Sequence, residues 1–182
     1  MNSLILEAAP HWQRVPWNSR RCLGLEGRVA SWIFESGSLT QRLRTTFAER
    51  VSVEVLQQGP HFVSRTEARA LGVPPGLRLI IREVVLRVGP TPMILARSLW
   101  PQATMQRADR RLWRLGNQPL GEILFSHKAL QRNTLEFTRT RLKPDGGLET
   151  AVVFGRRSLY TLGPRAPLLV AEFFLPPCLK TP

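Results

Sequence analysis

The sequence is poor in the residues on which several common kinds of site depend. It has two cysteines, Cys22 and Cys178, and three histidines, His11, His61 and His127, among 182 residues. The cysteines are too few and too far apart for a disulfide framework or a zinc-binding spacing, and no two histidines have metal-ligand spacing. We therefore expect free thiols, no bound metal and no histidine-activated nucleophile.

Long apolar segments are also missing. No apolar run reaches the roughly 18 residues that a membrane-spanning helix needs. The first ten residues have no basic segment followed by a long apolar stretch, as a secretory signal would have. Hydrophobic residues make up 43% of the chain and charged residues 21%, which is ordinary for a globular protein. These features predict a cytoplasmic location, no membrane span and a substantial core.

Acidic residues are half as numerous as basic ones. The net charge is +13, from 26 lysines and arginines minus 13 aspartates and glutamates. Two explanations stay open: nucleic-acid binding, in which phosphate neutralisation dominates affinity, or a small anionic substrate with the remaining charge as compositional bias. The basic runs are short, and no nucleic-acid-binding motif accompanies them. We interpret them as solvated surface and expect no nucleic-acid partner; they are Arg20-Arg21, Arg110-Arg111 and Arg156-Arg157.

Capping patterns and apolar spacing in the sequence predict short helices between strands. Residues 1–22 are expected to be irregular and residues 23–182 to form a single domain. Ser38-Leu-Thr-Gln41 is a capping-box pattern, and Leu39, Leu43 and Phe47 follow at four-residue spacing, which predicts a short helix capped by Ser38. Other helices are expected over about 27–35, 107–115 and 119–125.

Several segments have the composition or the alternation of strands. The connection Gly89-Pro-Thr-Pro92 predicts a hairpin, and hairpins make antiparallel neighbours. We therefore predict an α+β fold, with an about six-stranded, mostly antiparallel sheet and helices between and over its strands. Residues 71–76, with Pro74-Pro75, are expected to form a turn. The expected strands begin at 51 and cover 77–88, 93–100, 134–142, 152–162 and 168–175.

Three charged residues interrupt apolar strands. The neighbours of Arg82 and of Arg97 on their own strand faces are apolar, and Glu172 is the only charge in the last strand. A buried, unpaired ion costs several kcal/mol, so these charges need partners. One interpretation is a structural ion pair between Glu172 and one arginine. Because two arginines and one carboxylate leave an excess positive charge, the pattern also predicts an enclosed pocket for a small anion.

Two further features bear on this pocket. The first backbone N–H groups of the helices that begin near Leu39 and Leu120 have no partner within the helix, and they suit an anion. Glu83 lies on the strand face opposite Arg82. We interpret Glu83 as a surface residue or as a partner of Arg87 or Arg78.

Several segments, taken in order, resemble the chorismate lyase family, whose members convert chorismate to 4-hydroxybenzoate and pyruvate. They span most of the chain, and their ordered set carries the resemblance. The segments are Ser38-Leu-Thr-Gln-Arg-Leu, Val51-Ser-Val, Leu79-Ile-Ile-Arg-Glu-Val-Val-Leu, Ala96-Arg-Ser, Leu115-Gly-Asn-Gln-Pro-Leu-Gly-Glu-Ile-Leu-Phe, Gly155-Arg-Arg-Ser-Leu and Pro167-Leu-Leu-Val-Ala-Glu-Phe-Phe-Leu-Pro.

The resemblance implies an antiparallel sheet with an internal pocket closed by two helix-turn flaps. It implies that Arg82 holds the ring carboxylate of the ligand, assisted by the backbone amides of Leu39 and Leu120, and that Glu172 contacts the ring hydroxyl. Arg97 is expected nearby, where it would steady the second carboxylate, on the enolpyruvyl group. No cofactor is expected, because aromatisation of the ring drives the reaction.

An enclosed apolar pocket with matched polar ends predicts retention of 4-hydroxybenzoate and product inhibition. The resemblance implies a role in ubiquinone synthesis, and we expect a monomer. The alternative is a sensing domain that binds a small anion without catalysis. Ligand-binding domains of GntR-type repressors share this general fold, with a similar arginine-bearing strand and hairpin. Release of pyruvate would distinguish the enzyme from the sensor.

Overall fold

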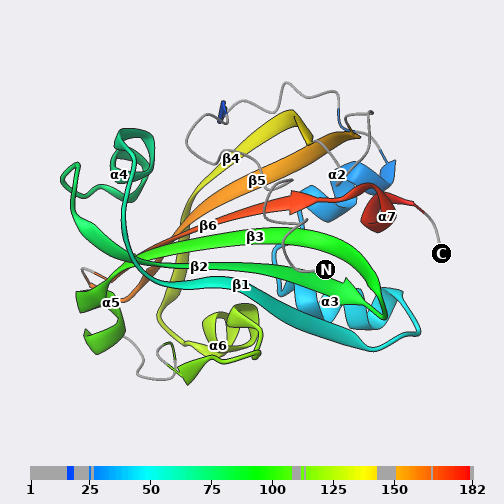
Figure 1. Cartoon of the computed structure of the whole chain (residues 1–182), viewed down its shortest axis with the longest axis horizontal. Helices are drawn as coiled ribbons and strands as arrows, with labels where there is room; N and C mark the ends of the chain where they lie inside the picture. The colour runs from blue at the N-terminus through cyan, green and yellow to red at the C-terminus, as the bar shows by residue number, and fades with distance from the viewer. Residues whose placement is uncertain are drawn as a thin grey trace.

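Six long strands form one antiparallel sheet in the order β1-β2-β3-β6-β5-β4 (Figure 1). Every neighbouring pair runs antiparallel, which confirms the predicted α+β fold class. The structure, a computed structural model, describes residues 16–18, 25, 27–107, 112, 114–142, 151–164 and 166–180. The strands are β1 (Val51–Phe62), β2 (Arg78–Val88), β3 (Thr91–Pro101), β4 (Leu130–Leu142), β5 (Ala151–Leu162) and β6 (Pro167–Phe174).

Short helices connect and cover the strands. In Figure 1, α3 and α6 neighbour each other below β1 and β2, whereas α4 lies on the other side of the strands. None of the described helices is long and apolar enough to cross a membrane. Their bounds are α2 (Gly27–Ile33), α3 (Leu39–Thr46), α4 (Arg65–Leu71), α5 (Gln102–Arg107), α6 (Leu120–Ser126) and α7 (Pro176–Leu179).

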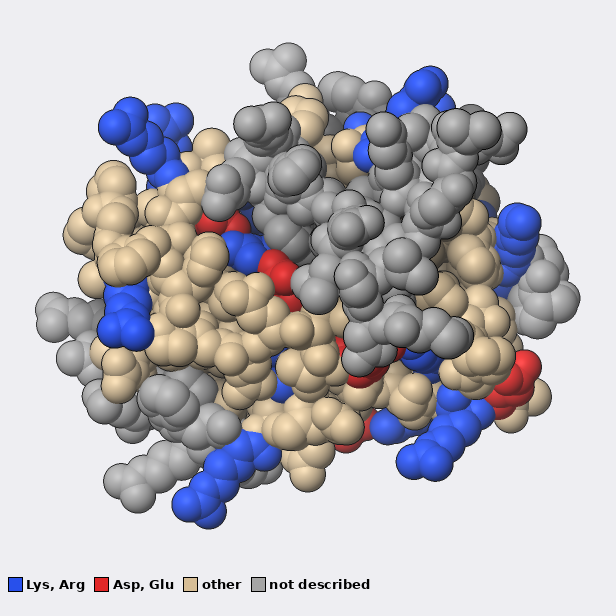
Figure 2. Space-filling model, in the orientation of Figure 1, with Lys and Arg blue, Asp and Glu red and all other residues tan. Residues whose placement is uncertain are grey.

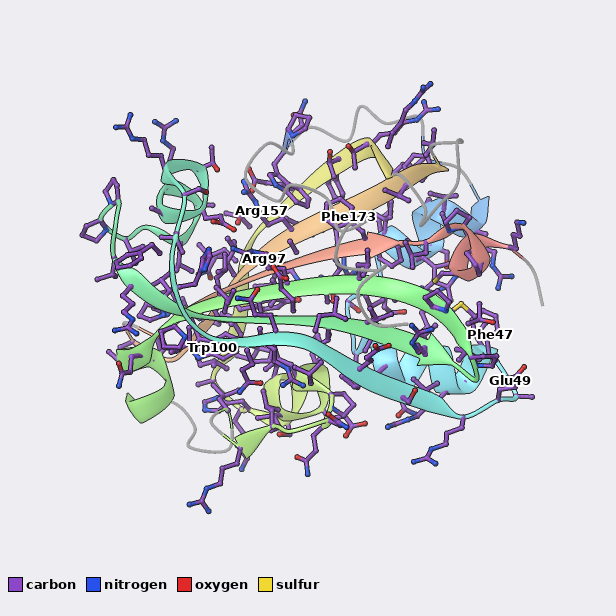
Figure 3. All side chains as sticks on the ribbon, in the orientation of Figure 1. Phe47, Glu49, Arg97, Trp100, Arg157 and Phe173 are labelled. Atoms are coloured by element: carbon purple, nitrogen blue, oxygen red, sulfur yellow. The ribbon has the colours of Figure 1, made fainter. Side chains whose placement is uncertain are left out.

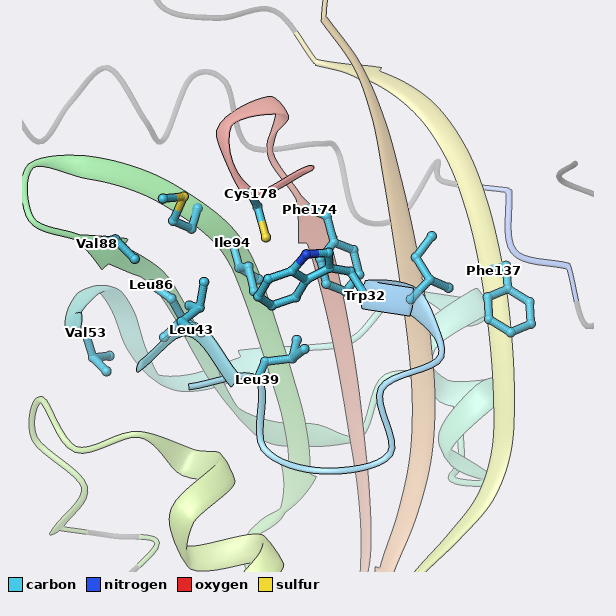
Figure 4. Close-up of a cluster of buried hydrophobic side chains, with 12 residues drawn as sticks. Trp32, Leu39, Leu43, Val53, Leu86, Val88, Ile94, Phe137, Phe174 and Cys178 are labelled. Carbon is cyan, nitrogen blue, oxygen red and sulfur yellow. The ribbon is translucent and has the colours of Figure 1, made fainter. Parts of the chain in front are cut away.

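The helix predicted after Ser38 forms as expected. The backbone N–H of Gln41 donates to the Ser38 hydroxyl at 3.4 Å, so Ser38 is the N-cap of α3. Leu39 and Leu43 are buried in a cluster with Trp32 of α2 and Phe174 of β6 (Figure 4). This cluster fixes α2 and α3 against one end of a single sheet face.

A second apolar cluster fixes α6 against the other end of the same face. It includes Ile123 and Leu124 of α6, Trp100 of β3 and Tyr160 of β5. The opposite face of the sheet is covered by α4, whose Ala68 and Leu71 pack with Leu79, Ile81, Leu99 and Leu169. The two helix-bearing clusters on the first face leave a space between them, and the candidate site lies there.

Helix α4 has no counterpart in the sequence predictions. Ser64 and Glu67 form a capping box, in which each side chain accepts a hydrogen bond from the backbone N–H of the other residue. The Ser64-Arg-Thr-Glu67 spacing is the signal that could have revealed it. The predicted helix over 107–115 falls largely outside the described residues, and α5 ends at Arg107 where that prediction begins.

A one-residue register shift in the β2–β3 hairpin decides which charges share a face. Near the turn Val88 lies opposite Thr91, and continuing that register would bring Arg82 opposite Arg97. Met93 is an extra residue, however, and beyond it Arg82 lies opposite Ser98 while Glu83 lies opposite Arg97. A one-residue shift moves every later side chain to the other face. Arg82 and Arg97 therefore point to opposite faces of the sheet.

A short part of the N-terminal segment reaches the sheet. Asn18 exchanges backbone hydrogen bonds with Phe137 of β4, at 2.9 and 2.8 Å. The Trp17 ring lies 5.6 Å from that of Phe173, so this tryptophan packs onto the sheet. The predicted boundary at residue 22 falls among residues that the structure does not describe, so it stays a prediction.

Candidate active site

The candidate site is a pocket between the sheet and the first turns of α3 and α6. Its free space is about 540 Å³, which includes solvent at its opening. Its wall is mostly apolar, with charged groups from β2 and β6. The lining residues are Ser38, Leu39, Thr40, Arg82, Val84, Leu86, Ala96, Ser98, Leu120, Gly121, Leu124, Phe125, Tyr160, Val170 and Glu172.

Arg82 is the buried cation of this pocket, with a side chain only 1% exposed. It donates to the side-chain oxygen of Gln58 and to the carbonyls of Gly116 and Gln118, at 2.9 and 3.1 Å. Burial lowers the pKa of Arg82 from its ordinary value. Among the described residues no carboxylate contacts this guanidinium, so its positive charge is held by neutral oxygens alone. Such a cation favours an anionic ligand.

Glu172 lies on β6, two strands away from Arg82, and lines the same pocket. At the usual strand spacing the two backbones are about 10 Å apart across the sheet. The Oε2 atom of Glu172 accepts a hydrogen bond from Nε of Arg156 at 2.6 Å. Within the described chain, its other carboxylate oxygen takes no hydrogen bond. Glu172 can therefore present one oxygen to a hydrogen-bond donor on a ligand.

Arg156 was missed by the sequence predictions, which placed the Arg156-Arg157 pair on the solvated surface. Its side chain is 1% exposed, and that surface interpretation is wrong. Besides Glu172, Arg156 donates to the carbonyls of Ile33, at 3.1 Å, and of Glu35. It thus holds the Glu172 carboxylate and the connection from α2 to α3 together. The expected ion pair of Glu172 with an arginine exists, but its partner is Arg156.

Arg97 does not lie in this pocket, so its predicted place beside Arg82 is wrong. Arg97 lies on the other sheet face, where its Nε donates to Glu67 at 2.9 Å and its Nη1 to Glu83. Figure 3 shows Arg97 on β3 and Arg157 on β5, which both lie opposite Ala171 in the strand register. The physical cause is the register shift at Met93, which no periodicity within one strand reveals.

Glu83 was interpreted as a surface residue or a partner of Arg87 or Arg78, and this is wrong as well. Its side chain is buried and shares Arg97 with Glu67 of α4. Arg87 pairs instead with Glu54, its Nε donating at 2.6 Å. The two glutamates more than compensate the single charge of Arg97, which makes it a structural cation, unlike Arg82.

The first turns of α3 and α6 meet at the mouth of the pocket. Leu39 and Leu120, whose amides were predicted to bind the ligand, both line it. A side chain at Gly121 would begin 3.0 Å from the Ser38 hydroxyl oxygen, so the missing side chain permits this close approach. Arg44 of α3 and Glu122 of α6 form an ion pair across the gap. The two helices together make a cover over the pocket.

The described charges favour a small anion inside the protein over a nucleic acid on its surface. The charged residues that line the pocket are Arg82 and Glu172, and Glu172 is paired with Arg156, whereas the described partners of Arg82 are neutral oxygens. On the face drawn in Figure 2, the described lysine and arginine side chains project separately around the rim and do not gather over one element. The arrangement suits a flat ligand with a carboxylate at one end and a hydrogen-bond donor at the other.

Comparisons with known proteins agree with this site. The family model for chorismate lyase matches residues 11–181. A "Probable chorismate pyruvate-lyase" of Methylococcus capsulatus is 43% identical over 161 residues, covering 85% of this chain and 98% of the relative. A protein of the same name from Marinobacter nauticus is 36% identical over 161 residues, covering 88% of this chain and 83% of the relative.

Solved structures share the fold at low sequence identity. A GntR-family transcriptional regulator from Bacillus cereus superposes with a TM-score of 0.53 at 12% identity, covering 72% of this chain and 96% of the other. At this identity the likeness shows the fold alone. It supports the antiparallel sheet and does not bear on what the pocket binds.

Proposed function

Since the chain belongs to the chorismate lyase family, we propose that it is a carbon–oxygen lyase that eliminates pyruvate from chorismate and leaves 4-hydroxybenzoate. The observation that carries the proposal is the buried Arg82, which has no carboxylate partner among the described residues and lines one pocket with Glu172. Their separation suits a benzene ring with substituents at opposite ends. The reaction itself is taken from the names of the relatives, which are called probable chorismate pyruvate-lyases.

The ring carboxylate is assigned to Arg82 and the backbone amides of Leu39 and Leu120. The ring hydroxyl is assigned to Glu172, whose second carboxylate oxygen accepts its hydrogen bond. In the reaction the ether bond between ring and enolpyruvyl group breaks, and the hydroxyl-bearing carbon loses its hydrogen. Aromatisation drives the step, and the departing enolpyruvyl group gains a proton to become pyruvate. Holding the ring in place lowers the barrier by several kcal/mol.

Two routes for the departing hydrogen can be separated by isotope labelling. Either Glu172 removes it as a base, or it passes directly to the methylene carbon of the enolpyruvyl group. Deuterium placed on the hydroxyl-bearing carbon of chorismate is retained in the methyl group of pyruvate if the transfer is internal. Deuterium found only in solvent rules that transfer out.

The proposal is tested by incubating the purified protein with chorismate in the presence of a chelator. We expect 4-hydroxybenzoate and pyruvate in equal amounts without an added metal or cofactor. Binding of a small anion without release of pyruvate would contradict the proposal and favour the sensing domain. Because the pocket is covered, we also expect slow release of 4-hydroxybenzoate, and progress curves that stay linear with added product would contradict this.

We extend the proposal to the surroundings of the reaction. The 4-hydroxybenzoate product supplies ubiquinone synthesis, and the enzyme acts in the cytoplasm as a monomer. The role in ubiquinone synthesis is tested by expressing this protein in a ubiquinone-deficient strain that lacks its own chorismate lyase and measuring growth. The monomeric state is tested by sedimentation of the purified protein.

A further inference from the structure

Tyr160 of β5 is a polar residue of the pocket that the proposed mechanism does not use. It lines the pocket, its side chain is only 3% exposed, and its ring packs edge-on against Phe125 of α6. Its phenol oxygen accepts two hydrogen bonds from Arg132 of β4, from Nε at 3.0 Å and from Nη2 at 2.6 Å. The hydroxyl is thus held from one side by a guanidinium.

These two hydrogen bonds leave the Tyr160 hydroxyl available only as a donor. A phenol has one O–H donor, and both of its acceptor positions are taken by Arg132. Within the described chain, no oxygen accepts the Tyr160 proton. An adjacent guanidinium makes the phenol a stronger donor, because it withdraws electron density from the oxygen. A buried donor of this kind matches an anionic acceptor brought by a ligand.

Tyr160 and Glu172 lie on the neighbouring strands β5 and β6 and line the same pocket. Arg132 donates to the carbonyl of Glu35 at 3.5 Å, and Arg156 donates to the same carbonyl. Arg156 in turn holds Glu172. Tyr160 therefore lies on the Glu172 side of the pocket across the sheet, three strands away from Arg82 and nearer the α6 end along the strands. In chorismate the enolpyruvyl ether occupies the ring carbon next to the one that bears the hydroxyl.

We propose that Tyr160, supported by Arg132, binds the carboxylate of the enolpyruvyl group. This inference rests on the proposed function and assigns the second carboxylate, which Arg97 does not reach. It divides the dianion between two different donors, a cation at the ring carboxylate and a neutral phenol at the leaving group. Once pyruvate has left, 4-hydroxybenzoate no longer uses the phenol.

The test compares two stable ligands that differ only in the enolpyruvyl group: 4-hydroxybenzoate and 3-(1-carboxyvinyloxy)-4-hydroxybenzoate, which is already aromatic and cannot react. Affinities are measured by calorimetry for the wild-type protein and for Tyr160→Phe. We expect the variant to bind the diacid about 10-fold more weakly, as for one hydrogen bond to a charged group, and 4-hydroxybenzoate within about 2-fold of wild type. Phe125→Leu changes the same wall without removing a donor, and should affect both ligands equally.

Equal weakening of both ligands in Tyr160→Phe, or no weakening of either, would overturn the inference. If that variant does not fold, Arg132→Gln is read in the same way, and the diacid alone should weaken. Tyr160 is also the single tyrosine of the chain, so tyrosine labelled with ¹³C at Cζ gives one resonance. We expect the diacid to shift it and 4-hydroxybenzoate to leave it nearly unmoved. Absence of pyruvate from chorismate would contradict the proposed function separately, because these binding measurements need no turnover.

Discussion

Arg82 and Arg97 are both buried arginines on adjacent central strands, yet they occupy opposite faces of the sheet and opposite electrostatic situations. Arg97 is surrounded by Glu67 and Glu83, so its charge is compensated within the protein. Among the described residues, the partners of Arg82 are an amide and two carbonyls, so none of them compensates its charge. Burial of an arginine therefore does not by itself indicate a binding site, whereas the absence of a carboxylate among its described neighbours does.

The difference in sheet face recurs at two arginines of β5. Arg156 and Arg157 are consecutive on β5, and each pairs with a glutamate, Arg156 with Glu172 and Arg157 with Glu136. Only Arg156 faces the pocket side, because successive strand residues alternate between faces. One face of the sheet therefore carries the proposed chemistry, and the other carries ion pairs that hold the strands to each other and to α4.

The largest effects are expected from Arg82→Met, which should lower activity, and from Arg97→Met, which should lower stability. Arg82→Met should lower kcat/KM for chorismate at least about 100-fold, because two charge-assisted bonds to the ring carboxylate are lost, while the protein stays folded. Arg97→Met should lower the free energy of unfolding by about 3–5 kcal/mol, because the buried carboxylates of Glu67 and Glu83 lose their ion pair with Arg97. Urea unfolding and steady-state kinetics measure the two effects. A stable, inactive Arg97→Met protein would place Arg97 in the ligand site.

The next largest effect is a difference in kcat between Arg156→Gln and Arg157→Gln. Arg156→Gln should lower kcat about 10- to 100-fold, because Glu172 loses the bond that orients it. Arg157→Gln removes a comparable ion pair on the other face and should keep kcat within about 2-fold of wild type. Initial rates of pyruvate release, measured below the melting temperature of both variants, give the comparison. Equal losses in the two variants would show that the pairs act only on stability.

A smaller effect is expected at the cover of the pocket. The Arg44–Glu122 pair between α3 and α6 is more than two-fifths exposed on both sides, so it contributes at most about 1 kcal/mol. Glu122→Gln should speed release of 4-hydroxybenzoate up to about 5-fold, as should high salt on the wild type. The exchanged pair Arg44→Glu with Glu122→Arg should restore slow release in stopped-flow measurements. If the rate of 4-hydroxybenzoate release is unchanged in every variant, this ion pair does not control opening of the cover.

The smallest effect is expected at low pH in the loop between α2 and α3. The backbone N–H of Gly37 donates to Glu35 at 2.8 Å and holds the pKa of that carboxyl below its ordinary value of 4.5, with Arg42 assisting. A lowered pKa stabilises the fold above the ordinary value, and the contribution is lost as the pH falls through the folded one. Wild type should therefore be more stable than Glu35→Gln at pH 7 and lose that advantage as the pH falls below 4.5 and through the lowered pKa of Glu35. A difference between the two that does not change with pH would contradict this.

The sequence predicted the strands, the α3 cap and two of the three suspected charges, because these depend on local periodicity and on charges within apolar strands. Arg82 and Glu172 were found in this way, and the structure places both at one pocket. Arg97 was misplaced because its face depends on the extra residue at Met93, which changes the pairing between strands. Arg156 was missed because two adjacent arginines look like surface residues until their strand is known to lie inside the sheet.

The most direct test of this account is a crystal structure with 4-hydroxybenzoate bound. We predict its carboxylate on the guanidinium of Arg82 and its hydroxyl on the carboxylate of Glu172, beneath α3 and α6, with Arg97 still paired to Glu67 and Glu83. A ligand bound on the opposite face against Arg97, with the pocket at Arg82 unoccupied, would contradict it.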